Sequence, residues 1–184
     1  MLDAVKRVTF YSNSLEKVKR ILARVTRGWK QGKSIDVLKL DPIALELLEA
    51  ERLILFSSMP ETYVALEKGR LDSLMPVRDG LIIVTTGRLG ESSLSRLLGV
   101  ASLPILMSSS RAAYLFMLRA HCGDRNMLHR SAVDTLARSR SSVWIVKGMC
   151  LAKSIVKHCP VCVRDRKLKC SQQIAKIKPE NLEV

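Results

Sequence analysis

The chain has 184 residues, a formal net charge of +14 at pH 7 and a hydrophobic content of 47%. This apolar content excludes wholesale disorder, and the aromatic content of only 4% excludes a core built on aromatic rings. The positive charge predicts a polyanionic partner, most simply nucleic acid, with a solvated basic surface as the alternative.

The first predicted element is a helix within residues 12–33. Its apolar residues, including Leu15, Val18 and Leu22, recur at helical spacing. Ser14 precedes them and is a favourable N-cap residue. This part of the chain is therefore expected to be an amphipathic helix with one buried face.

A second helix is predicted at 42–58, a segment that is rich in leucine and in acidic residues. We expect Leu45, Leu48 and Leu53 to contribute to its apolar stripe. Together, the two helices assign residues 1–72 to a helical linker region.

The pattern changes to short β-rich runs in residues 73–107. Two runs flank Asp79-Gly80, a dipeptide that favours a tight hairpin turn, although Pro76 weakens the first run as a strand. The run LPILM at 103–107 is expected to form another short strand. A small β-hairpin region is therefore predicted here.

Helical patterns return in residues 108–166. Helices are predicted at 109–121, 129–140 and 147–158, and the segment 141–146 is expected to be extended. The chain after these helices is polar and basic. The overall fold class is therefore α+β and mainly helical.

The five cysteines are an odd number, which argues against a complete disulfide framework. The start of the chain has no signal-peptide core, and no apolar run approaches the roughly 18 residues of a membrane span. We therefore expect an intracellular protein with reduced thiols and no membrane partner.

Cys159 and Cys162 are two residues apart, a spacing that lets one tight turn direct both sulfur atoms at one ion. His121 and His129 flank a short loop that brings both rings toward the same point. Two thiolates and two neutral imidazoles balance the charge of Zn²⁺. The pattern predicts a tetrahedral zinc site, with a helix cap and a surface residue as the alternative roles of the two histidines.

Other residues leave alternatives open around this site. Cys122 and His158 directly adjoin proposed ligands, and either is a candidate replacement. Cys150 is expected to fill space in the core, and Cys170 to be a free thiol. Thiol exchange is the other use of a C-x-x-C pair, but it favours a pair at the start of a helix after a strand.

The order of these motifs resembles the amino-terminal zinc-binding domain of retroelement integrases, the HHCC or H2C2 module. The closest resemblance is to BEL/Pao retrotransposons. Trp144, Ile145 and Gly148 of this chain match the pattern that precedes the two cysteines in that group. Upstream, DGLIIVTTGRL is similar to the stretch before that module. The segment SNSLEKVKRILARVTRGW resembles the bridge between the ribonuclease H and integrase regions.

This resemblance implies a three-helix HHCC module at 108–166, stabilised by a structural Zn²⁺ on His121, His129, Cys159 and Cys162. It also implies a role in DNA integration, with nucleic-acid binding, DNA above all, and self-association into a homo-oligomer. The location implied is the nucleus or a cytoplasmic particle.

Positive charge is concentrated in and after this module, where 167–184 is expected to be a basic tail or connector. Side chains of this kind contact phosphates without reading sequence. The residues assigned to nucleic-acid binding are Lys147, Lys153, Lys157, Arg164, Arg166, Lys167 and Lys169.

The chain also departs from the family. Ser131 occupies a position where the family often has glycine, and the acidic residues of an integrase catalytic core are not found in the 184 residues. We therefore expect the chain to have no enzyme activity. We expect its origin to be a fragment of a polyprotein, a decayed copy of the element or a host gene derived from one. The alternative is a protein–protein interaction module of a retroelement-derived host protein, docking through residues 42–56 and 103–107.

Overall fold

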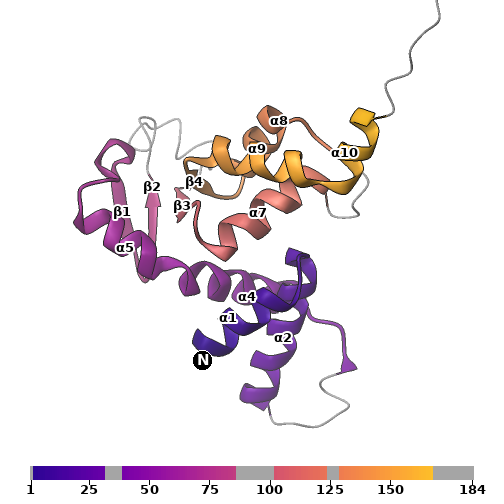
Figure 1. Cartoon of the computed structure of the whole chain (residues 1–184). Helices are drawn as coiled ribbons and strands as arrows, with labels where there is room; N and C mark the ends of the chain where they lie inside the picture. Colours follow the sequence, from indigo (N-terminus) through magenta and orange to yellow (C-terminus); the bar gives the residue numbers. More distant parts are fainter. Residues whose placement is uncertain (1, 32–38, 86–101, 124–128, 168–184) are drawn as a thin grey trace, which may run out of the picture.

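The computed structural model describes residues 2–31, 39–85, 102–123 and 129–167 (Figure 1). The described part is mainly helical with one small sheet, which confirms the predicted α+β class. Its elements are α1 (Leu2–Tyr11), α2 (Leu15–Gln31), α4 (Ala44–Ser57), α5 (Met59–Glu67), the 3₁₀ helix η1 (Asp72–Leu74), β1 (Pro76–Asp79), β2 (Ile82–Thr85), β3 (Leu103–Met107), α7 (Arg111–Cys122), α8 (Ala132–Ser139), β4 (Trp144–Val146), α9 (Gly148–His158) and α10 (Pro160–Lys167).

The amino-terminal helices α1, α2 and α4 pack against one another, and α2 and α4 are neighbours (Figure 1). The predicted cap of α2 is present, because the backbone N–H of Lys17 donates to Ser14 Oγ at 3.4 Å. Leu15, Val18 and Leu22 are buried, as expected from their spacing. Helix α1 was not predicted from the sequence. None of the described helices is long and apolar enough to cross a bilayer.

The contact between α2 and α4 is strongly charged. The Arg27 side chain is only 6% exposed, and its Nε donates to Glu46 Oε1 at 2.7 Å. Arg27 also donates to the backbone carbonyls of Leu40 and Asp41, at 3.0 and 3.2 Å. Three ion pairs connect the two helices: Lys19 with Glu51, Arg27 with Glu46, and Lys30 with Glu49.

These ion pairs turn α4 differently from the sequence prediction. Leu45 and Leu48 are 63% and 59% exposed, so their assignment to the buried stripe is wrong. The buried positions of α4 are instead Ala50, Ile54 and Leu55. The acidic side chains of α4 face the basic side chains of α2, and this orientation leaves the first leucines in solvent.

The predicted hairpin is present in β1 and β2. These strands are antiparallel, and Asp79 pairs with Ile82 across a turn formed by Gly80 and Leu81. Gly80 has a φ of 58°, which glycine adopts at the first position of such turns without strain. The dipeptide signal in the sequence therefore located the turn correctly.

The sheet has the order β1-β2-β3-β4. The predicted strand LPILM is β3, which pairs antiparallel with β2 and parallel with β4. Ile105 and Leu106 on β3 are fully buried. Since β4 comes from the segment assigned to the zinc module, the sheet joins that segment to the preceding β-region.

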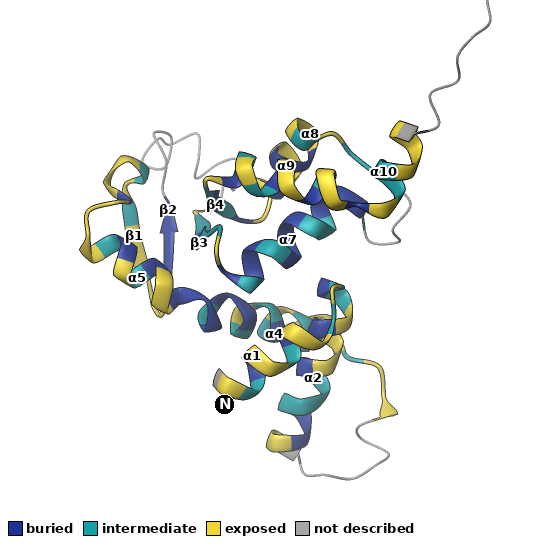
Figure 2. Ribbon diagram, in the orientation of Figure 1, coloured by how far each residue is buried: buried dark blue, intermediate teal, exposed yellow. Residues whose placement is uncertain are grey.

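The carboxyl-terminal helices surround α7, which is mostly buried (Figure 2). Ser110 and Ser131 cap α7 and α8, each accepting a backbone N–H at 3.2 Å. The serine that departs from the family pattern therefore starts a helix. Gly148 begins α9 where an added Cβ would lie 2.8 Å from Leu136 Cδ1, so glycine permits the close packing of α8 and α9.

Candidate metal centre

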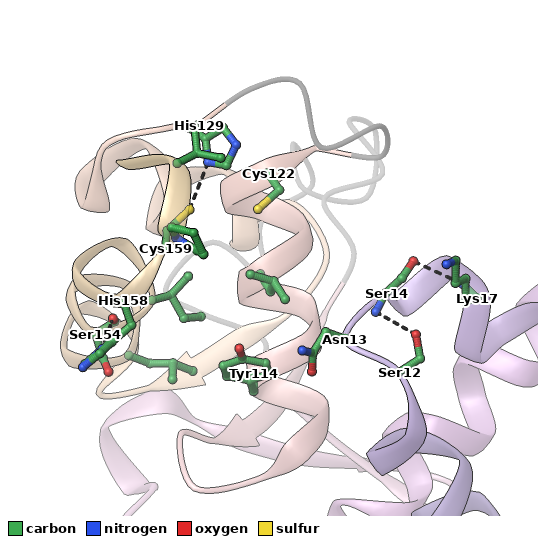
Figure 3. A pocket seen from close by; sticks show the side chains of 15 residues that line it. Ser12, Asn13, Ser14, Lys17, Tyr114, Cys122, His129, Ser154, His158 and Cys159 are labelled. Atoms are coloured by element: carbon green, nitrogen blue, oxygen red, sulfur yellow. Dashed lines mark hydrogen bonds between the residues drawn. The ribbon is translucent and has the colours of Figure 1, made fainter. Parts of the chain in front are cut away.

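The structure brings His121, His129, Cys159 and Cys162 together. His121 lies in the last turn of α7, and His129 lies just before α8. Cys159 occupies the junction of α9 and α10, and Cys162 is in the first turn of α10. Three separate parts of the carboxyl-terminal region therefore supply the four side chains; Figure 3 shows His129 directed at Cys159.

The donor atoms are close enough to share one metal ion, and three of their separations are near those of a tetrahedral site. They all lie within 4.8 Å of one another. His129 Nδ1 is 3.4 Å from His121 Nε2 and 3.2 Å from Cys159 Sγ, and Cys162 Sγ is 3.4 Å from His121 Nε2. Ordinary zinc–ligand bond lengths place two nitrogens about 3.3 Å apart and a nitrogen and a sulfur about 3.6 Å apart. The group could therefore hold one metal ion.

Burial favours the neutral forms of His121 and Cys162. His121 is fully buried, and desolvation, followed by the charge of His129, lowers its pKa below the ordinary 6.5. The imidazole therefore stays neutral, the form that binds metals. Desolvation, followed by the neighbouring Cys159, raises the pKa of Cys162. Since a cysteine binds metal as its thiolate, a bound cation would stabilise the deprotonated form of this half-buried thiol.

A buried hydroxyl positions the first histidine. Thr135 is fully buried, and its Oγ1 lies 3.4 Å from His121 Nδ1, the ring nitrogen that faces away from the cluster. The backbone N–H of Arg130 also donates to the carbonyl of His121, at 3.2 Å. A hydroxyl partner on the ring nitrogen, as Thr135 provides, fixes the tautomer and the direction of a metal-binding imidazole. Sequence reasoning missed Thr135, because nothing in the sequence distinguishes this threonine from any other on a helix.

We expect Thr135→Val to weaken metal binding by about tenfold to a hundredfold, because it removes the partner of His121 and keeps the side-chain shape. Competition with a chromogenic chelator measures the affinity. The matched control is Thr62→Val, since Thr62 is equally buried and its Oγ1 donates to the carbonyl of Ile105, outside the cluster. Equal affinities of the two variants would contradict a positioning role for Thr135.

The candidate replacement ligands lie outside the four-residue group. His158 is exposed, and its Nδ1 donates to the carbonyl of Ser154 at 2.8 Å. Cys122 is buried, and its pKa is raised by burial and then by the two nearby cysteines. Cys150 is exposed on α9, so the prediction that it fills space in the core is wrong. Cys170 lies outside the described residues.

The basic residues assigned to nucleic-acid binding lie in different environments. Lys147, Lys153 and Lys157 are exposed, and the last two are one turn apart on α9. Arg164 is exposed near Asp165, with 3.9 Å between the charged atoms. These side chains are free to meet a partner from solvent.

Arg166 makes bonds within the protein. Its Nε donates to the carbonyl of Cys162, and its Nη2 donates to the carbonyls of Val156 and Lys157, at 2.9 and 3.3 Å. It therefore caps the end of α9 and holds α10 against it. The side chain of Lys167 and all of Lys169 lie outside the described part.

A cavity of about 750 Å³ lies beside the cluster, between the α1–α2 turn, α7 and α9 (Figure 3). Its lining includes Ser14, Tyr114, Cys122, His129, His158 and Cys159. Two of the candidate ligands, His129 and Cys159, therefore border this cavity.

Comparison with known proteins does not identify the integrase family that the motifs resemble. The chain gives no significant match to protein-family models, to curated proteins or to solved structures. The functional argument therefore depends on the geometry of the described residues.

Proposed function

We propose that His121, His129, Cys159 and Cys162 bind one structural Zn²⁺. The convergence of four donor atoms from three segments within 4.8 Å carries this proposal. Two thiolates and two neutral imidazoles match the charge and the tetrahedral geometry that zinc prefers. Four protein ligands leave no open position for an activated water, so the ion stabilises the fold and performs no chemistry.

We propose further that this centre belongs to an integrase-like H2C2 module of BEL/Pao type, which is not catalytic. Its support is the order of the motifs together with the meeting of the two histidines and the two cysteines in one cluster. Such a module supports DNA integration by contacting nucleic acid and by self-association. The zinc holds α7, α9 and α10 in the arrangement that presents these surfaces.

Nucleic-acid contact has its support in charge and exposure. Lys153 and Lys157 lie exposed on α9, on the side away from its buried residues Ala152 and Ile155. Lysines arranged in this way neutralise phosphates and release counterions, so the resulting affinity depends steeply on salt. The contact would be with the sugar–phosphate backbone and would carry little sequence information.

Native mass spectrometry of the purified chain tests the metal. We expect a mass increment of one zinc ion per chain that disappears after treatment with a strong chelator. A metal-free chain with unchanged helicity, or two ions per chain, would contradict the proposed centre.

A second candidate, a protein-interaction module, has one observation in its favour. Ile43, Leu45 and Leu48 are each about 60% exposed near the start of α4. The other segment considered for docking is buried in the sheet, because Ile105 and Leu106 are fully covered. The leucines of α4 are therefore the surface on which this candidate depends.

Salt dependence separates the two candidates. If the first is correct, binding of a 30-base-pair DNA duplex should weaken steeply between 50 and 200 mM salt. Fluorescence anisotropy of a labelled duplex measures this. Absence of duplex binding at low salt, combined with salt-insensitive capture of a protein partner that Leu45→Asp abolishes, would favour the second candidate.

A further inference from the structure

The outer face of α1 combines exposed aromatic and basic side chains. Val5 and Thr9 point inward and are 2% and 3% exposed. The opposite side forms a shallow surface hollow of about 470 Å³. The hollow is lined by residues at helical spacing on one face: Asp3, Lys6, Arg7, Phe10 and Tyr11.

Two aromatic rings project into solvent from this face. Phe10 is 70% exposed and Tyr11 is 88% exposed. Aromatic residues make up only 4% of the chain, and a ring of this size ordinarily contributes to the core or to an interface. Exposure of two adjacent rings therefore indicates a surface that contacts another molecule.

The rings stand on a rigid support. The Arg111 guanidinium lies over the Phe10 ring at 5.7 Å and over the Tyr114 ring at 4.8 Å. It also donates to the backbone carbonyls at the end of α1, those of Thr9 at 3.0 Å and Ser12 at 3.2 Å. These bonds from α7 hold the last turn of α1 in place, and the Arg111 guanidinium contacts the Phe10 ring.

The charge of the face favours an anion. Lys6 and Arg7 are exposed, and neither side chain forms an ion pair or a hydrogen bond within the described residues. Asp3, one turn earlier, is the acidic residue of the face. The two rings lie one turn after the two cations and Asp3 lies one turn before them, so the five residues carry two positive charges and one negative charge.

We propose that the outer face of α1 binds single-stranded nucleic acid. Unpaired bases stack on Tyr11 and Phe10, and the phosphates next to them contact Lys6 and Arg7. Aromatic rings beside cations are the arrangement that holds single strands without sequence preference, because every base has a π-face. A duplex hides these faces, so the rings select unpaired strands. This inference rests on the nucleic-acid part of the proposed function, and it places a second contact outside the metal-binding region.

Fluorescence anisotropy with a labelled 20-nucleotide oligo(dT) tests the role of the rings. We expect Tyr11→Ala in the full zinc-loaded chain to weaken binding by about tenfold, while Tyr11→Trp binds at least as tightly as the wild type. Because Tyr11 is 88% exposed, its replacement leaves the core intact, and circular dichroism verifies this. Binding of a duplex should change little. Labelled oligo(U) shows whether RNA or DNA is the tighter ligand.

The role of the cations is tested by Lys6→Ala combined with Arg7→Ala. We expect the slope of log affinity against log salt for oligo(dT) to fall by about 1.4, the value for two phosphate contacts on a single strand. The matched control is Lys68→Ala combined with Arg70→Ala, which removes the same charge from exposed positions after α5. The control should keep the wild-type slope.

Several results would overturn the inference. Wild-type affinity of folded Tyr11→Ala for oligo(dT) would remove the rings from the site. The wild type and Tyr11→Ala are also tested on vesicles of phosphatidylcholine and phosphatidylserine. If Tyr11→Ala loses vesicle binding but keeps wild-type affinity for oligo(dT), the face binds a lipid surface instead. If the wild type binds neither oligonucleotide nor duplex, the nucleic-acid part of the proposed function fails as well. If the wild type binds nucleic acid and the substitutions on α1 do not change its affinity, this inference fails and the proposed function stands.

Discussion

Replacing Cys159 with serine is expected to abolish metal binding and to remove most of the far-UV helicity of the carboxyl-terminal region. The serine hydroxyl stays protonated at neutral pH and is a poor zinc ligand, so the tetrahedral set loses one corner. Zinc binding to small structural sites contributes about 10–16 kcal/mol, comparable with the total stability of an ordinary domain. Short helices such as α8 and α10, of eight residues each, bury too little to persist without it.

Circular dichroism and native mass spectrometry measure this effect. The matched control is Cys150→Ser, which makes the same substitution at an exposed cysteine outside the cluster and should keep both the metal and the helicity. Removing zinc from the wild type with a chelator should reproduce the spectrum of Cys159→Ser. A metal-free Cys159→Ser chain with wild-type helicity would show that the packed helices need no ion.

The second large effect is expected at the contact between α2 and α4. Arg27→Met should destabilise the protein by about 3 kcal/mol, because it leaves the Glu46 carboxylate, 18% exposed, without its partner. It also leaves the backbone carbonyls of Leu40 and Asp41 without a donor. Urea unfolding at pH 7 measures the loss. The control Lys30→Met removes a solvent-exposed ion pair and should change stability by less than about 1 kcal/mol.

The pH dependence of this difference tests its cause. The hydrogen bond from Arg27 holds the pKa of Glu46 below its ordinary 4.5 in the folded protein, with help from the backbone N–H of Ile43. The stabilisation is therefore present above pH 4.5 and is lost as the pH falls through the lower folded-state value. In Arg27→Met, burial instead favours the protonated acid. The stability difference between the two proteins should shrink on acidification; a constant difference would exclude ionisation as its source.

The candidate metal-binding group and the hairpin were accessible from the sequence because their signals are local. Cys159 and Cys162 are separated by one turn, His121 and His129 by one short loop, and Asp79-Gly80 marks a turn by its own conformational preferences. Local spacing of this kind limits where side chains can point, whatever the rest of the fold does. The structure accordingly places all four candidate residues in one group that could hold a metal.

Elements that depend on distant contacts were accessible only in part. The segment that contains β4 was expected to be extended, but its parallel pairing with β3 could not be predicted from three residues. Helix α10 has no apolar stripe and depends on the bonds of Arg166 to the end of α9. Hydropathy alone predicts that Arg27 is exposed to solvent. In the structure its ion pair with Glu46 allows the side chain to be buried. In each case a partner far along the chain decides the outcome.

The parallel pairing of β3 with β4 has a consequence for how the chain folds. Ile105 and Trp144 are roughly forty residues apart, and all of α7 and α8 lies between them. Closing such a large loop has a substantial entropic cost before any ladder bond forms, which slows folding. An ion that first gathers the end of α7 and the start of α10 shortens the search for this register. We therefore expect the refolding rate to rise with available zinc, so that metal supply controls the kinetics of folding as well as the final stability.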